Sequence, residues 1–246
     1  MLSRVDPTLC IYGDSHLAGI KLALNEKRID PGAVQIEFWG ADGPQFREIH
    51  MVDGRMTPTT DAASARVALI NANGRKDIGA NDFGQYLFVG GRLRSHEYIA
   101  PMLNRLRDDI GFLSRAVRLR VLTRWLNGCR SYRTAREFAQ SGGARVLFAP
   151  ASFLNDQVVR ESDVAREINE NATAEDRGVV WDEMSEAMAA DGVELLRQPE
   201  ITVTRGCLTK LDYAANRVIE NRDTVHKNGT YGALVLGEAL TRLQLT

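Results

Sequence analysis

The sequence has no long hydrophobic run and few of the residues that build disulfide or metal frameworks. Nowhere in its 246 residues does an apolar stretch approach the roughly 18 residues of a membrane-spanning helix. Its three cysteines, Cys10, Cys129 and Cys207, are odd in number and far apart, which excludes a disulfide framework and a paired zinc motif. We therefore expect reduced thiols, no metal and no cofactor. Because the N-terminal residues lack the basic and apolar regions of a signal peptide, the expected compartment is the cytoplasm.

An excess of charge of one sign is also missing. The 31 Lys and Arg residues nearly balance the 32 Asp and Glu residues, which leaves a net charge of −1. This balance gives no reason to expect nucleic acid or an anionic membrane as a partner. Arginines do cluster between Arg115 and Arg136. We interpret them as a solvated helix face, and attraction of anionic or carbohydrate substrates is the alternative.

The patterns that are present predict one α/β domain over residues 1–246, since no repeat, low-complexity segment or linker divides the chain. Apolar runs that end in turns predict five strands, over residues 9–12, 34–39, 86–89, 145–149 and 193–196. Helical spacing predicts helices over residues 15–27, 44–51, 97–127, 131–140, 163–190 and 229–243. Strands that alternate with helices indicate a parallel sheet. The 97–140 stretch is a candidate helical insertion or lid, and residues 67–70 are expected to form a short strand or hairpin arm.

A serine stands where the first strand gives way to a helix, in Gly13-Asp14-Ser15. A strand-to-helix turn can expose a nucleophilic hydroxyl beside the backbone N–H groups that open the helix. Serine and aspartate are also ordinary helix N-caps, so the tripeptide alone is compatible with both interpretations. We expect Asp14 to hold the turn by hydrogen bonds to nearby backbone.

Two further features supply what a nucleophilic serine needs. Asp223 precedes His226 by three residues, just before the last predicted helix, so its carboxylate can reach one imidazole nitrogen while the other faces outward. An acid that orients a histidine, which takes a proton from serine, is the logic of a catalytic triad. Gly43 lies before a helix, as Ser15 does, and both can offer a backbone N–H to an oxyanion.

Taken together, these motifs resemble the SGNH (GDSL-type) hydrolase family. The first motif stands near the N-terminus, the second is 40-Gly-Ala-Asp-Gly-43, and Asp223-Thr224-Val225-His226 precedes the C-terminal helix, so the resemblance spans nearly the whole chain. It implies a three-layer α/β/α fold with a central, mostly parallel sheet of about five strands, of the flavodoxin-like type. It also implies that Ser15 is the nucleophile, His226 the general base and then acid, and Asp223 the orienting carboxylate, with an oxyanion hole that includes the N–H groups of Ser15 and Gly43.

The chain departs from the family pattern after the central strand. The family has Gly-x-Asn-Asp there, and the Asn side chain donates to the oxyanion, whereas this chain has Gly90-Gly91-Arg92. Arg92 thus stands at the expected donor position. The alternatives are that Asn73 or Asn155 replaces the donor, that the donor is absent, or that Arg92 is a salt-bridged surface residue.

The resemblance predicts a serine hydrolase that cleaves an acyl or acetyl ester of a small molecule or glycan through an acyl-serine intermediate. One alternative is an acyltransferase of the same fold that passes the acyl group to a glycan hydroxyl. Another is a non-catalytic carbohydrate-binding protein on a degenerate scaffold of this type, which the missing Asn would favour.

Overall fold

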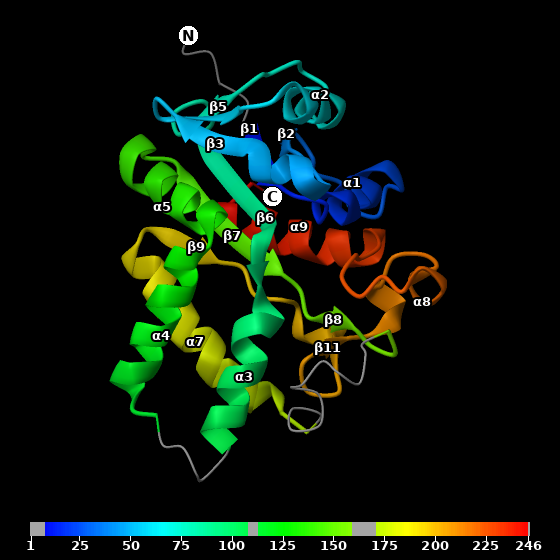
Figure 1. The fold of residues 1–246 in the computed structure, drawn as a ribbon. Helices are drawn as coiled ribbons and strands as arrows, with labels where there is room; N and C mark the ends of the chain where they lie inside the picture. The colour runs from blue at the N-terminus through cyan, green and yellow to red at the C-terminus, as the bar shows by residue number, and fades with distance from the viewer. Residues whose placement is uncertain (1–7, 108–112, 159–170, 246) are drawn as a thin grey trace.

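Figure 1 shows the computed structural model, which describes residues 8–107, 113–158 and 171–245. Its centre is a sheet of five strands, all parallel, in the order β2-β1-β6-β7-β9. These strands are β1 (Thr8–Gly13), β2 (Gln35–Gly40), β6 (Gln85–Arg94), β7 (Arg145–Ala151) and β9 (Val193–Leu195). The predicted α/β class and the five-strand parallel sheet are confirmed.

Helices cover both faces of this sheet (Figure 1). On one face α1 (Leu17–Asn25) packs against α9 (Gly229–Leu243), and both contribute to a mainly aliphatic core. On the other face α5 (Arg130–Gly142) packs on β6 and β7, and α7 (Ala174–Ala190) packs on β9. The described chain therefore has helices on each side of one sheet, as a three-layer α/β/α arrangement requires.

The sequence of the inner strands explains why the two faces differ. Successive residues of a strand point to opposite faces, and β1, β6 and β7 are aligned so that like residues stand side by side. One face carries the buried aromatic rings of Tyr12, Phe88 and Phe148. The other carries the buried aliphatic side chains of Ile11, Leu87 and Leu147. The middle residues of these central strands, which are buried on both faces, are therefore apolar.

Several expected elements take a different form. Residues 67–70 are not a strand but the last turn of α2 (Asp61–Ile70), which begins at a Thr60 cap whose hydroxyl accepts the N–H of Ala63 at 3.2 Å. The helix expected over 44–51 is a 3-10 helix, η1 (Gly43–Glu48), because the chain then pairs as a hairpin. The hairpin strands are β3 (Ile49–Val52) and β4 (Arg55–Pro58), and β5 (Ile78–Gly79) joins them.

The 97–140 stretch forms three helices, which lie in different parts of the fold. They are α3 (Ser95–Arg107), α4 (Arg115–Gly128) and α5. Because α5 lies directly on the sheet, it is not part of an insertion, and only α3 and α4 extend beyond the sheet, beside α7 (Figure 1). The helix expected over 163–190 is described from Ala174 onward as α7, and residues 163–170 lie outside the described residues.

The remaining short elements lie around the carboxyl ends of the central strands and before α9. They are β8 (Leu154–Asn155), η2 (Glu200–Thr202), β10 (Val203–Thr204), β11 (Leu208–Thr209), η3 (Leu211–Tyr213) and α8 (Val218–Asn221). Strand β11 pairs with both β8 and β10 in a small separate sheet.

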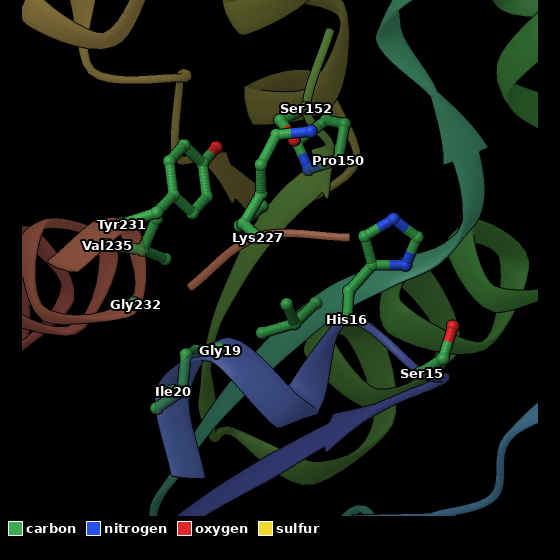
Figure 2. Close-up of a pocket in the computed structure, with 12 residues that line it drawn as sticks. Ser15, His16, Gly19, Ile20, Pro150, Ser152, Lys227, Tyr231, Gly232 and Val235 are labelled. Atoms are coloured by element: carbon green, nitrogen blue, oxygen red, sulfur yellow. The ribbon is translucent and has the colours of Figure 1, made fainter. Parts of the chain in front are cut away.

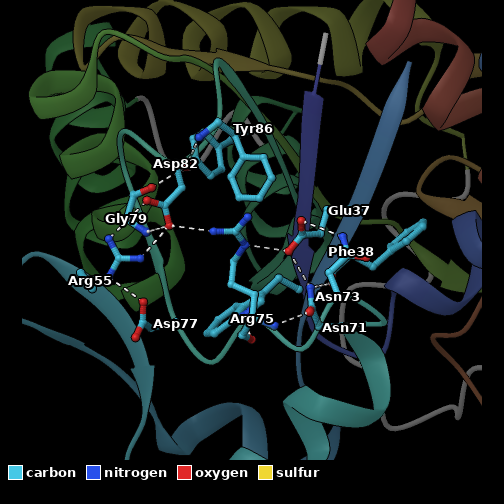
Figure 3. Close-up of polar contacts among 12 residues, drawn as sticks. Glu37, Phe38, Arg55, Asn71, Asn73, Arg75, Asp77, Gly79, Asp82 and Tyr86 are labelled. Atoms are coloured by element: carbon cyan, nitrogen blue, oxygen red, sulfur yellow. Dashed lines mark hydrogen bonds and ion pairs between the residues drawn. The ribbon is translucent and has the colours of Figure 1, made fainter. Parts of the chain in front are cut away.

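A polar network fastens the segment before β6 to β2 (Figure 3). The buried Glu37 of β2 accepts hydrogen bonds from Asn71, Asn73 and Arg75 at 2.8–3.0 Å. Burial acts to raise the pKa of Glu37, but these three donors outweigh it, and the pKa lies below its ordinary value. The network therefore holds Asn73 against β2, with the Asn73 amide bonded to the Glu37 carboxylate.

Candidate active site

Ser15 lies at the carboxyl edge of the sheet, in the turn between β1 and α1. β1 ends at Gly13, beside Gly40 at the end of β2, and α1 begins at Leu17. The Leu17 N–H donates to the Asp14 carbonyl at 3.1 Å, which closes the turn around the serine. Open parallel sheets bind their ligands at this edge, so the local fold puts the serine hydroxyl where a ligand could meet it.

The structure brings Ser15, His226 and Asp223 together in one chain of hydrogen bonds. His226 Nε2 lies 2.8 Å from Ser15 Oγ, across 211 residues of sequence. His226 Nδ1 lies 2.8 Å from Asp223 Oδ2. Both distances are those of good hydrogen bonds. The three residues expected from the sequence to form a triad thus stand in the order that a triad requires.

The close packing of α1 against α9 explains how residues so far apart in sequence meet. α1 follows Ser15 directly, and α9 begins just after His226, so the crossing of the helices sets the distance between the two side chains. A Cβ on Gly232 would stand 2.1 Å from the Gly19 carbonyl oxygen, which no side chain tolerates. Only glycine at position 232 permits this approach.

Asn155 holds the loop that carries Asp223 and His226. Its side-chain Nδ2 donates to the carbonyls of Asp223 and His226 at 3.0 and 3.2 Å, and its backbone N–H donates to the Thr224 carbonyl at 2.7 Å. The alternative in which Asn155 or Asn73 replaces the missing oxyanion donor does not fit this arrangement. Both N–H groups of the Asn155 amide are engaged with the loop, and the Asn73 amide is bonded to Glu37.

Asp223 is arranged to remain ionised. Its Oδ1 accepts the backbone N–H groups of Val225 and His226 at 3.0 and 3.1 Å, which orients the carboxylate toward the imidazole. Partial burial acts to raise the pKa of Asp223, but these hydrogen bonds and the contact with His226 lower it below its ordinary value. An ionised Asp223 can stabilise the imidazolium that forms when His226 takes a proton.

Asp14 forms a second pair with a histidine on the other side of the serine. Its Oδ1 accepts the His16 backbone N–H at 3.1 Å and lies 2.6 Å from His16 Nδ1, and its Oδ2 accepts the Arg92 N–H at 3.1 Å. A Cβ on Gly90 would come within 2.6 Å of both Asp14 and His16, so the strand beneath the pair must have glycine there. Asp14 holds the turn as expected. The role of His16 beside it was missed, although the Asp-x-His spacing indicates such a pair.

Gly43 and Arg92 lie together at the opening of η1. Gly43 is the first residue of η1 and has a left-handed φ of +56°. Arg92 Nη2 donates to the Gly43 carbonyl at 3.0 Å, and no carboxylate in the described parts of the chain forms an ion pair with Arg92. Arg92 is therefore not a salt-bridged surface residue. The backbone N–H groups of Ser15 and Gly43 donate to no described residue, which leaves them available to an oxyanion.

A small cavity lies behind the serine (Figure 2). It has a volume of about 30 Å³ and is lined in part by Ser15, His16, Ser152, Lys227 and Tyr231. Such a volume holds one or two water molecules. The Lys227 ammonium donates to the Val225 carbonyl at 2.8 Å, and burial lowers the pKa of Lys227 to about 7.

Comparison with protein-family models, with curated proteins and with solved structures found no match to this chain. Among residues 8–107, 113–158 and 171–245, no helix is long and apolar enough to cross a membrane. In the same ranges no group of three His, Cys, Asp or Glu side chains is placed to hold a metal ion.

Proposed function

We propose that this protein is a serine hydrolase of the SGNH (GDSL-type) family that cleaves an acyl or acetyl ester through an acyl-serine intermediate. The observation that carries the proposal is the hydrogen-bonded order Asp223–His226–Ser15 at the carboxyl edge of a parallel sheet. The strand order β2-β1-β6-β7-β9, which is the flavodoxin-like order, and the serine after β1 also support it. The cytoplasmic location stays a prediction.

The reaction begins when Ser15 Oγ attacks the carbonyl carbon of the ester and His226 Nε2 takes the hydroxyl proton. Asp223 stabilises the resulting imidazolium through Nδ1. The carbonyl electron pair moves to oxygen, and the N–H groups of Ser15 and Gly43 donate to this oxyanion. As the pair returns, the C–O bond to the alcohol breaks, and His226 gives its proton to the departing alkoxide. An acyl-serine remains.

Hydrolysis of the acyl-serine repeats these steps with water as the nucleophile. His226 takes a proton from the water, whose oxygen attacks the acyl carbon, and the collapse of the second tetrahedral intermediate returns the proton to Ser15 Oγ. The carboxylic acid then departs. We assign to Arg92 the role of holding the Gly43 carbonyl, which restrains the residue whose N–H donates to the oxyanion.

A covalent serine probe tests this proposal. A fluorophosphonate should label the wild type and not the Ser15→Ala variant, while Ser152→Ala, which changes a buried serine of the neighbouring cavity, should retain labelling. Turnover of 4-nitrophenyl acetate and butyrate should follow the same order. Absence of labelling and of turnover in the wild type would overturn the proposal, and saturable carbohydrate binding that survives Ser15→Ala would then favour a binding protein.

An acyltransferase would share the acyl-serine and differ only in the acceptor. The His226 side chain is 37% exposed, so a sugar hydroxyl could reach it as well as water could. Glycan acceptors should be added to the 4-nitrophenyl acetate reaction. If the product is acetylated glycan and not free acetate, the protein is an acyltransferase and not a hydrolase.

A further inference from the structure

A second, larger cavity opens beside the proposed oxyanion site. It has a volume of about 320 Å³ and lies among η1, β6 and the start of α5. The residues that shape it include Phe46, Arg47, Gly91, Arg92, Cys129 and Arg130. Arg92 joins this cavity to the active site, because its guanidinium donates to the Gly43 carbonyl while its backbone N–H donates to Asp14.

Three of these lining residues are arginines without a counter-charge. In the described parts of the chain, Arg47, Arg92 and Arg130 form no ion pair with a carboxylate. Asp14, Asp42 and Glu97 are themselves paired, with His16, Arg66 and Arg94 respectively. Three guanidinium groups therefore meet at this cavity without an ion-paired carboxylate in the described chain.

Backbone contacts hold two of the guanidinium groups in place. Arg130 donates to the carbonyls of Phe46 and Arg47 at 3.0 and 2.8 Å, and Arg92 donates to Gly43. Arg92 Nε is buried and has no hydrogen-bond partner among the described residues. Burial first, and then repulsion from Arg47, Arg94 and Arg130, lower the pKa of Arg92, although Asp14 opposes the shift. Holding like charges together costs free energy, and a bound anion would offset this cost.

We propose that this arginine cavity binds an anionic group, a phosphate or a carboxylate, on the ester that Ser15 cleaves. Planar guanidinium groups bind both anions through paired N–H donors. The ester part of the inference rests on the proposed function, whereas the anion site does not. Because Arg92 contacts both the cavity and Gly43, an anion held there would lie beside the reacting carbonyl.

Direct binding tests the site without any chemistry. Inorganic phosphate should bind the Ser15→Ala variant in calorimetry, and Arg47→Gln should weaken its Kd at least tenfold. In the described parts of the chain the Arg47 side chain makes no hydrogen bond or ion pair, and its backbone carbonyl accepts from Arg130, so the substitution leaves that contact intact. Arg120→Gln, at an exposed position on α4 outside the cavity, is the matched control and should leave the Kd unchanged. No phosphate binding, or equal binding in both variants, would overturn the site.

Matched substrates test the specificity. We expect kcat/KM for acetylated glucose 6-phosphate or acetylated galacturonic acid to exceed that for acetylated glucose at least tenfold, and Arg47→Gln to abolish the preference. The two anionic substrates distinguish phosphate from carboxylate. Equal rates for charged and neutral esters would overturn the substrate assignment. If phosphate binds but no ester is cleaved and no probe labels Ser15, the hydrolase proposal fails while the anion site stands.

Discussion

Two aspartate–histidine pairs flank the same serine, and they are built alike. In each, the carboxylate accepts the backbone N–H of the histidine and also contacts its ring Nδ1, at 2.6 Å for Asp14–His16 and 2.8 Å for Asp223–His226. The imidazole rings lie 5.8 Å apart. His226 Nε2 meets the serine hydroxyl, whereas His16 Nε2 is buried with no hydrogen-bond partner among the described residues.

The difference teaches that a carboxylate which orients a histidine does not by itself bring the histidine to the serine. His16 is 16% exposed, and it sits in the turn with its carboxylate, where the pair fixes Asp14 against Arg92. His226 is 37% exposed and arrives from the far end of the chain, on a loop that Asn155 holds. The two pairs therefore differ in the partner of the histidine Nε2 atom and in the exposure of the imidazole to solvent.

Replacing the two histidines in turn gives the largest expected contrast. His226→Gln should lower kcat for 4-nitrophenyl acetate by about 10⁴-fold or more, because the proton acceptor of Ser15 is lost. His16→Gln should change kcat by less than about tenfold. Both variants should be measured at equal folded concentration, checked by circular dichroism. Equal losses in the two variants would mean that His16 takes part in the chemistry.

Replacing the two aspartates gives a smaller contrast of the same kind. Asp223→Asn should lower kcat by roughly 10³–10⁴-fold, since an amide cannot stabilise the imidazolium. Asp14→Asn should act mainly on stability, lowering the free energy of unfolding by about 1–3 kcal/mol, because a buried acceptor of three hydrogen bonds is weakened. Urea unfolding and initial rates measure the two effects separately. A mainly catalytic effect of Asp14→Asn contradicts this division.

Gly232→Ala should break the contact that delivers His226 but not the one that holds His16. The new Cβ would meet the Gly19 carbonyl, so we expect a loss of about 1–3 kcal/mol in the free energy of unfolding and a fall in kcat of up to about 10²-fold. Gly237→Ala, on the same helix, is the control. Its Cβ would make an ordinary contact with the Ile29 side chain at 3.5 Å. Because alanine favours a helix more than glycine does, thermal unfolding should show a free energy of unfolding that is higher by up to about 1 kcal/mol. A stable, fully active Gly232→Ala would refute this account.

Lys227, which lines the small cavity beside Ser15, should make stability depend on pH. Its pKa is about 7 in the folded protein against an ordinary value of 10.5. Between these two pH values the unfolded chain binds more protons than the folded protein. The free energy of unfolding should therefore rise with pH by up to roughly 1.4 kcal/mol per pH unit. Below pH 7 the full cost of burying the charged lysine lowers the free energy of unfolding. Lys227→Met should remove this rise. Urea unfolding from pH 6 to 10 measures it, and parallel curves for the two proteins would contradict the expected shift.

The sequence predicted those parts of the fold whose signals are local and strong. The closing helix was expected over 229–243 and is observed with those bounds, since Asn228 caps it by accepting the Tyr231 N–H at 3.1 Å. The predicted strand over residues 67–70 was wrong because its local signal is weak. A short apolar run is compatible with a strand or with the last turn of a helix, and the Thr60 cap that decides lies seven residues earlier.

The site residues that stand in short sequence motifs were predictable. The prediction failed for residues whose partners come from distant segments of the chain. Ser15, Asp223 and His226 were expected and are brought together. Asn155 was one alternative for the oxyanion donor, yet its amide supports the Asp223 loop, because β8 lies beside that loop in a way no local pattern indicates. The arginine cavity likewise joins residues from four separate elements, η1, β6, α4 and α5.

The crossing of α1 and α9 also orders the events of biosynthesis. Ser15 is synthesised more than two hundred residues before the helix that follows His226. If Ser15 is the proposed nucleophile, a nascent chain carries it without the proposed base until α9 has formed and packed against Gly19. Esterase activity would then arise only after the two helices have met.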